Sequence, residues 1–120
     1  MEKFLLLVRQ DLTMLKRITE DEHHELIGEM QRWVESLGES GNYLGGEPLT
    51  NAGKYVSHDQ VLSDGPFIEA KEAISGYILI SAENLDQAAS IAQTCPIVMR
   101  NEMVLEVRPI MAMRNVKVDG

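Results

Sequence analysis

FLLLV at residues 4–8 and GYILISA at residues 76–82 are the two stretches that decide the fold. Each has the length of a strand, and in each the apolar side chains occupy consecutive positions, so they point to both faces of a sheet. A strand with one face in water would instead alternate apolar and polar residues. The sequence therefore predicts a sheet that is covered on both faces.

A long amphipathic helix follows the first strand, which we place at Met1–Arg9. Thr19 is the predicted N-cap of this helix, and Glu22 completes a capping box. Gly38 and Gly41 end it, since glycine readily adopts the left-handed conformation found after helices. Its apolar stripe follows the helical repeat and consists of Leu26, Ile27, Met30, Trp33, Val34 and Leu37.

The other predicted elements are shorter. A turn-rich segment at 40–53 comes first, followed by two short strands at 54–58 and 60–63 that form a hairpin. The strand at 76–82 comes next, and then a helix that Asn84 caps and Pro96 ends. A last strand at 103–110 and a C-terminal tail at 114–120 complete the chain. Residues 1–113 thus form a single domain. Its β-α-β-β-β-α-β order predicts an α+β fold, an elaborated split βαβ sheet with two helices on one face.

Two helices cover only one face of such a sheet. The apolar residues on its second face need another surface, and a second copy of the chain packed by two-fold symmetry is the simplest one. We therefore expect a homodimer.

The last strand alternates Leu105 and Val107 with Glu106 and Arg108. If the apolar pair meets the helices, Glu106 and Arg108 enter the space between the two sheets of the dimer. A buried arginine there needs an anion, which is Glu106, another carboxylate or a ligand. Arg108 is therefore our preferred residue for binding a substrate anion.

The composition excludes several classes of function. The 120 residues include 11 basic and 19 acidic ones, a net charge of −8 that repels nucleic acid. The longest apolar run, at residues 4–8, is far shorter than the roughly 20 residues that a bilayer requires. Cys95 is the single cysteine and forms no internal disulfide. We expect a cytoplasmic protein that binds neither nucleic acid nor membrane.

DGPF at residues 64–67, followed by Glu69, Lys71 and Glu72, resembles the signature of the DGPF group of the YCII-related proteins. EVRP at residues 106–109 is similar to the last strand of that family, and GGEPL at residues 45–49 fits its loop after the first helix. The resemblance implies a ferredoxin-like sheet that pairs as a dimeric α/β barrel. It also implies lyase or isomerase chemistry on a small organic acid, with a His-Asp pair as the active site of the wider superfamily.

The DGPF segment has two interpretations. In the first it is a rigid turn, in which Asp64 accepts hydrogen bonds from the next backbone amides and Pro66 fixes the direction of the chain. In the second it holds Asp64, Lys71 and Glu72 at the mouth of a cleft, where Lys71 binds a substrate carboxylate and a carboxylate moves protons. Lys71 and Glu72 are explained equally well as an exposed ion pair.

His23 is the candidate proton carrier, with Asp64 as its partner in the pair that the resemblance implies. Extending the apolar stripe of the first helix backwards places His23 toward the sheet, where a structural histidine is the alternative. The three histidines and their acidic neighbours form no recognised metal-ligand spacing, and no motif predicts a cofactor.

Three functions follow from these observations. The first is a small-molecule enzyme in which His23 and Asp64 are catalytic while Lys71, Glu72 and Arg108 bind the substrate. The second is a non-catalytic ligand-binding or transcription-associated accessory module. The third is a structural dimer without a ligand.

Overall fold

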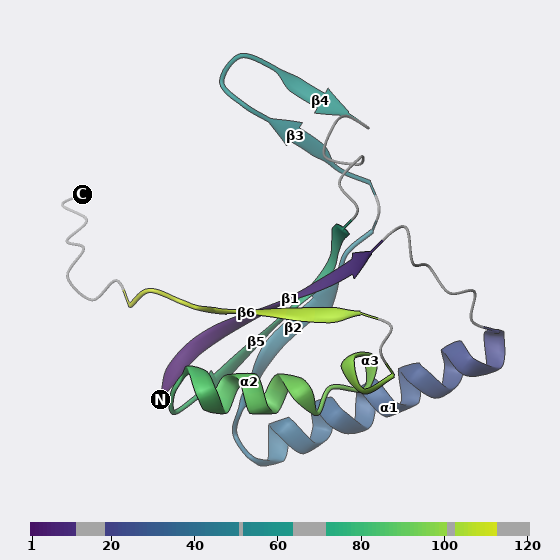
Figure 1. Ribbon diagram of the computed structural model, residues 1–120, viewed down its shortest axis with the longest axis vertical. Coiled ribbons are helices and arrows are strands. Elements are labelled where there is room, and N and C mark those ends of the chain that lie inside the picture. The colour runs from purple at the N-terminus through teal and green to yellow at the C-terminus, as the bar shows by residue number, and fades with distance from the viewer. Residues whose placement is uncertain (12–18, 51, 64–71, 101–102, 113–120) are drawn as a thin grey trace.

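A computed structural model describes residues 1–11, 19–50, 52–63, 72–100 and 103–112 (Figure 1). Its elements are β1 (Glu2–Asp11), α1 (Glu20–Glu39), β2 (Tyr43–Pro48), β3 (Lys54–Val56), β4 (Val61–Ser63), β5 (Glu72–Ala82), α2 (Leu85–Gln93), α3 (Pro96–Met99) and β6 (Val104–Pro109). The predicted tail at 114–120 and most of the DGPF segment, residues 64–71, lie outside the described residues.

The main sheet has the order β2-β5-β1-β6, and all its neighbouring strands are antiparallel. β5 lies between β1 and β2, while β1 lies between β5 and β6. Each helical connection therefore joins two strands that have a third strand between them. This is the split βαβ arrangement of a ferredoxin-like fold, and the predicted α+β fold class is confirmed.

The core lies between the helices and one face of this sheet, which we call the inner face (Figure 1). Phe4 and Leu6 of β1 and Ile80 of β5 are fully buried there. Trp33 and Leu37 of α1 are also buried, as the predicted stripe requires, whereas Ile27 of the same stripe is exposed. Thr19 caps α1, since its Oγ1 accepts a hydrogen bond from the amide of Glu22 at 3.1 Å.

The opposite face of the sheet, the outer face, is covered by none of the described helices (Figure 1). Leu6 pairs with Val107 and Val8 with Leu105, so the apolar residues of β6 share the inner face. Leu7 pairs with Glu106 and Leu5 with Arg108, so both charged residues share the outer face. The predicted division of β6 into a helix-facing and an outward-facing side is confirmed.

A strand occupies part of the segment that we predicted to be turn-rich. β2 pairs with β5 along the sheet edge, with Gly46 opposite Ile78. Asn42 holds the start of β2 in place, because its Nδ2 donates to the carbonyl of Ser81 at 2.8 Å. A Cβ at Gly46 would lie 2.6 Å from the carbonyl oxygen of Tyr77, so only glycine allows this close approach. The glycines thus permit strand pairing here instead of a turn.

Pro96 also differs from its predicted role. α2 ends at Gln93, three residues before Pro96, and Pro96 is instead the first residue of the short helix α3. Proline is favoured at this position because its missing N–H would have no partner inside the helix.

The predicted hairpin is present as β3 and β4, with Tyr55 opposite Leu62 and Val56 opposite Val61. It projects from the end of the main sheet (Figure 1). Tyr55, Val56 and Val61 are all exposed.

In the described part of the chain, no helix is both long and apolar enough to cross a membrane.

Candidate functional site

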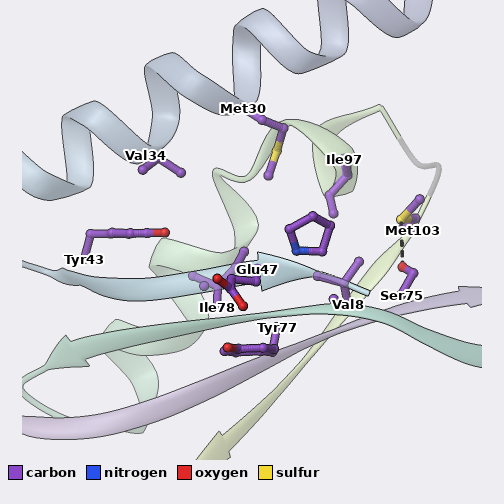
Figure 2. Close-up of a pocket in the computed structure, with 13 residues that line it drawn as sticks. Val8, Met30, Val34, Tyr43, Glu47, Ser75, Tyr77, Ile78, Ile97 and Met103 are labelled. Carbon is purple, nitrogen blue, oxygen red and sulfur yellow. Dashed lines mark hydrogen bonds between the residues drawn. The ribbon is translucent and has the colours of Figure 1, made fainter. Parts of the chain in front are cut away.

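A cavity of about 300 Å³ lies between α1, α3 and the inner face of the sheet (Figure 2). Apolar side chains form most of its wall, including Val8, Met30, Val34, Ile78 and Ile97. Ligand pockets typically measure about 300–1,000 Å³ and combine an apolar lining with a few polar groups. The cavity therefore has the size and character of a small-molecule site.

A β-bulge gives the cavity one of its polar groups. Val8 of β1 pairs with Gly76 and Arg9 pairs with Ile74, so Ser75 is the extra residue on β5. Bulges of this kind redirect a side chain relative to the regular alternation of a strand. The Ser75 side chain lies beside Met103 at the cavity wall, with Oγ 3.8 Å from the Met103 Sδ (Figure 2).

A second hydroxyl comes from Tyr43, at the start of β2. Its ring runs along the sheet below Val34, with the hydroxyl directed toward the other residues of the lining (Figure 2). Leu44, which follows, is the extra residue of a second bulge, because Tyr43 pairs with Ile80 and Gly45 with Leu79. Both hydroxyls at the cavity thus lie at irregularities of the strands that bear them.

Charged side chains are turned away from this cavity. Glu47 borders the cavity but pairs with Tyr77. Because Tyr77 alternates with inner-face residues along β5, the side chains of Tyr77 and Glu47 both belong to the outer face. Figure 2 shows Tyr77 on the far side of the strands from Met30 and Val34. Of the described residues that line the cavity, only Glu47 has a charged side chain. The interior offered to a ligand is therefore apolar, with neutral hydroxyl groups.

Salt bridges hold α1 to the end of α3. Arg100 Nε and Nη2 donate to the two carboxylate oxygens of Glu29 at 3.1 and 2.6 Å, and Nη2 lies 3.7 Å from Glu25. The hydrogen bond from Arg100 lowers the pKa of Glu29 below its usual value. Next to this pair, Cys95 Sγ lies 3.7 Å from Met30 Sδ, and burial raises the pKa of the Cys95 thiol.

The stripe of α1 predicts that His23 faces the sheet. This prediction is wrong. The His23 side chain is exposed, and its ring lies 6.5 Å from that of His24. His23 precedes Met30 by seven positions, so the two share a helical face but lie about 10 Å apart along the helix axis. The N-terminal turns of α1 extend beyond the sheet in Figure 1, which explains the exposure.

The other predicted site residues lie outside this cavity or outside the described residues. Asp64 and Lys71 belong to the segment that is not described. Glu72 pairs through its backbone with Asp11, and its side chain is not described. Arg108 lies on the outer face, where its Nη1 donates to Glu106 Oε2 at 3.1 Å. His23 and Arg108 are therefore on different surfaces of the chain.

Arg108 is part of a small charged cluster on the outer face. Arg9 Nη1 also donates to Glu106, at 3.2 Å from Oε1, so two guanidinium groups share one carboxylate. The Arg108 side chain is 67% exposed. Over the described ranges, no three His, Cys, Asp or Glu side chains gather as metal ligands would.

The profile of the YCII-related domain matches residues 3–114. The chain belongs to the YCII-related family. The family recognised from the DGPF and EVRP motifs is confirmed, and the match spans nearly the whole predicted domain.

A solved structure with a similar fold is 5-chloro-2-hydroxyhydroquinone dehydrochlorinase from Burkholderia phenoliruptrix AC1100, in complex with 2,5-dihydroxybenzoquinone. It is 14% identical to the YCII-related chain, with a TM-score of 0.56, and the alignment covers 91% of this chain and 93% of that one. At this identity the likeness concerns the fold. The comparison with curated proteins found no match.

The cavity was missed by sequence reasoning, although its parts are visible in the sequence. Met30 and Val34 belong to the apolar stripe of the helix. The sequence pattern does not distinguish an apolar residue at the wall of a cavity from one in the packed core. Ser75 and Tyr43 stand out only through the bulges, and a bulge is defined by the register of two strands rather than by one sequence.

Proposed function

We propose that this YCII-related protein is a small-molecule enzyme that takes an uncharged ring compound into the cavity between α1 and the sheet. The observation that carries the proposal is an apolar cavity of about 300 Å³ with the hydroxyls of Tyr43 and Ser75 at its wall. A cavity of about 150 Å³ holds benzene, so twice that volume suits a single ring with several substituents.

The polarity of the wall selects the kind of substituent. A buried carboxylate on the ligand would need a cation, and the described lining residues include none. Neutral hydroxyl or carbonyl groups need only hydrogen-bond partners, which Tyr43 and Ser75 supply. The similar fold of a dehydrochlorinase that binds a dihydroxybenzoquinone supports a ligand of this class.

Lyase or isomerase chemistry on such a ring requires proton transfer. We propose His23 and Asp64 as the acid–base pair, as the sequence suggests. His23 is exposed and lies about 10 Å beyond Met30 along the axis of α1, so it would act only on a substituent that extends out of the cavity to within hydrogen-bond reach of its ring. Tyr43 and Ser75 would orient the ring.

In a second form of the proposal, the ligand is a small organic acid instead of an uncharged ring compound. Arg108 lies on the outer face with an exposed guanidinium, so an acid would bind there, between two sheets of a homodimer, with Lys71 and Glu72 as further contacts. This form places the ligand on the opposite face of the sheet from the cavity.

The homodimer is part of both forms. Leu5, Leu7, Tyr77 and Leu79 form an apolar surface on the outer face, and none of the described helices covers it. A second copy of the chain packed on this surface would remove it from water.

A panel of ligands of matched size separates these forms. Thermal shift and calorimetry would compare neutral hydroxylated rings such as hydroquinone and catechol with benzoate and small dicarboxylates. Val34→Phe narrows the cavity, whereas Val56→Phe adds the same ring on the exposed hairpin of β3 and β4. We expect neutral rings to stabilise the wild type and Val56→Phe but not Val34→Phe.

Three other results would change the assignment. Binding of carboxylates alone, lost in Arg108→Ala and retained in Val34→Phe, would overturn the cavity proposal in favour of the outer face. Binding of neutral rings without turnover of any of them, followed by chromatography and mass spectrometry, would indicate an accessory binding module. A chain that binds no compound of either class would be a structural dimer.

A further inference from the structure

Two methionine side chains line the cavity between α1 and the sheet, and each accepts a hydrogen bond through its sulfur. The Cys95 thiol donates to the Met30 Sδ, with the two sulfur atoms 3.7 Å apart. The Ser75 hydroxyl donates to the Met103 Sδ at 3.8 Å. Met30 and Met103 are both half-buried, so part of each side chain is available to a ligand in the cavity.

These two hydrogen bonds keep the methionines at the cavity wall. Methionine has three rotatable bonds and fills irregular gaps in protein cores, so a methionine beside an open space of about 300 Å³ would normally bend into it. Here each sulfur is bonded to a group that cannot follow. Cys95 is fully buried, and Ser75 is fixed as the extra residue of the bulge in β5. The donors therefore hold the cavity open and fix the position of its two thioethers.

The donor at Met30 retains its proton. Burial raises the pKa of the Cys95 thiol, so the S–H group is present at neutral pH. A thiolate would be an acceptor and could not bond to the lone pairs of a thioether. The buried cysteine thus has a defined task, which is to orient Met30.

Figure 2 shows where the two thioethers stand relative to the hydroxyls of the cavity. Met30 points from α1 toward the sheet, with Tyr43 to one side of it and Met103 and Ser75 to the other. A ring whose substituents face Tyr43 and Ser75 therefore lies below Met30 and beside Met103. Thioether sulfur makes favourable contacts with aromatic rings at about 5 Å, and a saturated ring offers no such contact.

We propose that Met30 and Met103 select an aromatic ring over a saturated one, and that Cys95 positions Met30 for this contact. The inference rests on the ring site proposed above and names both the class of ring and the residues that recognise it. Because the Ser75 proton points to Met103, the Ser75 oxygen faces the ligand as an acceptor. This end of the cavity suits a ring hydroxyl, so the ligand class is a phenol.

Two ligands of similar shape test the selection. Calorimetry would compare hydroquinone with the cyclohexanediol that has hydroxyls at the same ring positions, and we expect the wild type to bind hydroquinone about 10-fold more tightly. Met30→Leu and Met103→Leu conserve volume and should each lower this preference by about 3-fold. Met99→Leu is the matched control, since Met99 is exposed on α3, and it should keep the full preference.

Cys95→Ala tests the positioning role. It removes the donor to Met30, and we expect the preference for the aromatic ring to fall by up to the roughly 3-fold that Met30→Leu loses. In the Met30→Leu background the same change should have no further effect on the preference, because leucine accepts no hydrogen bond. A loss of stability alone would weaken the binding of both ligands equally and would leave the preference unchanged.

Methyl NMR supplies a readout in the unaltered chain. It has seven methionines, each with one methyl signal, and the leucine variants assign those of Met30, Met99 and Met103. The ring current of bound hydroquinone should shift the signals of Met30 and Met103 but not that of Met99. The cyclohexanediol has no ring current and should shift none of the three in this way.

The possible failures are distinct. A wild type that binds both rings equally, or leucine variants that keep the full preference, would overturn the methionine contact while leaving the cavity as a ring site. Equal loss of preference from Cys95→Ala in both backgrounds would overturn the positioning role of Cys95. A wild type that binds neither ring would overturn the proposed ring site and this inference together.

Discussion

Trp33 donates a hydrogen bond from its indole Nε1 to the Thr94 Oγ1, at 2.8 Å, and so joins the middle of α1 to the C-terminus of α2. The indole is buried, and Thr94 Oγ1 in turn donates to the carbonyl of Ile91 at 2.6 Å. The two longer helices are thus fixed to each other through a buried donor that needs its partner.

Thr94→Val removes this partner without changing the size of the side chain. The buried Trp33 N–H then loses its acceptor, and we expect the free energy of unfolding to fall by about 1–3 kcal/mol. Urea denaturation followed by tryptophan fluorescence measures the change. Thr94→Ser keeps the hydroxyl and should lose less. Equal stability of the valine and serine variants would show that the bond contributes nothing.

The Arg100–Glu29 pair predicts a dependence of stability on pH. The pKa of Glu29 is lowered in the folded state, chiefly by its hydrogen bond to Arg100. A lowered folded-state pKa stabilises the fold at neutral pH, and this contribution disappears as the pH falls from the ordinary value of 4.5 through the lower folded value. Arg100→Gln should therefore be destabilised relative to the wild type near pH 7, by a difference that shrinks as the pH falls below 4.5.

Arg32→Gln is the control for this experiment, because Arg32 acts on the pKa of Glu29 only through a weaker charge interaction. Denaturation curves of the three proteins across the acidic range measure the difference. A gap between the wild type and Arg100→Gln that stays constant with pH would contradict the assignment.

Gly46→Ala tests the close approach of β2 to β5. The added Cβ would meet the backbone oxygen of Tyr77 at 2.6 Å, and a backbone atom cannot rotate out of the way. We expect a loss of about 1–3 kcal/mol of stability, as for other overpacked sites. Gly53→Ala has no atom within 4 Å of its new Cβ and should be nearly neutral. A Gly46→Ala variant as stable as Gly53→Ala would mean that β2 is displaced from this position.

Cys95 should be unreactive in the folded protein. Its side chain is fully buried, and burial raises the thiol pKa, so little thiolate is present to react. We expect thiol labelling at about pH 8 to be at least ~100-fold slower in the folded than in the urea-unfolded chain. Cys95 is the single cysteine, so the rate measured by absorbance has one source. Rapid labelling under native conditions would indicate that the region between α2 and α3 opens.

Much of the fold could be predicted from the sequence because it depends on periodicity. The structure confirms the alternation in β6, and it confirms the stripe of α1 except at Ile27, which is exposed. β2 was not recognised because Gly45 and Gly46 resemble turn residues, whereas their role is to let the backbone approach β5. Strand pairing at that point is a tertiary effect, which local propensity does not contain.

The candidate site was harder to predict than the fold. His23 follows the period of α1, but the period says nothing about where the sheet beneath the helix ends. Ser75 is the extra residue of one bulge and Tyr43 directly precedes another, and the register of the paired strands reveals these bulges. The remaining candidates, Asp64 and Lys71, lie outside the described residues.

Leu49 donates its backbone N–H to the carbonyl of Ser75 at 2.9 Å, which closes the base of the excursion that carries β3 and β4. The main sheet is continuous below this point, with β2 and β5 already paired. The projecting hairpin is therefore a module that protein engineers could exchange. A reporter peptide inserted between Val56 and Val61, at the tip of the hairpin, would leave the four-stranded sheet and its helices unchanged and would keep Asp64 and Lys71 in the chain.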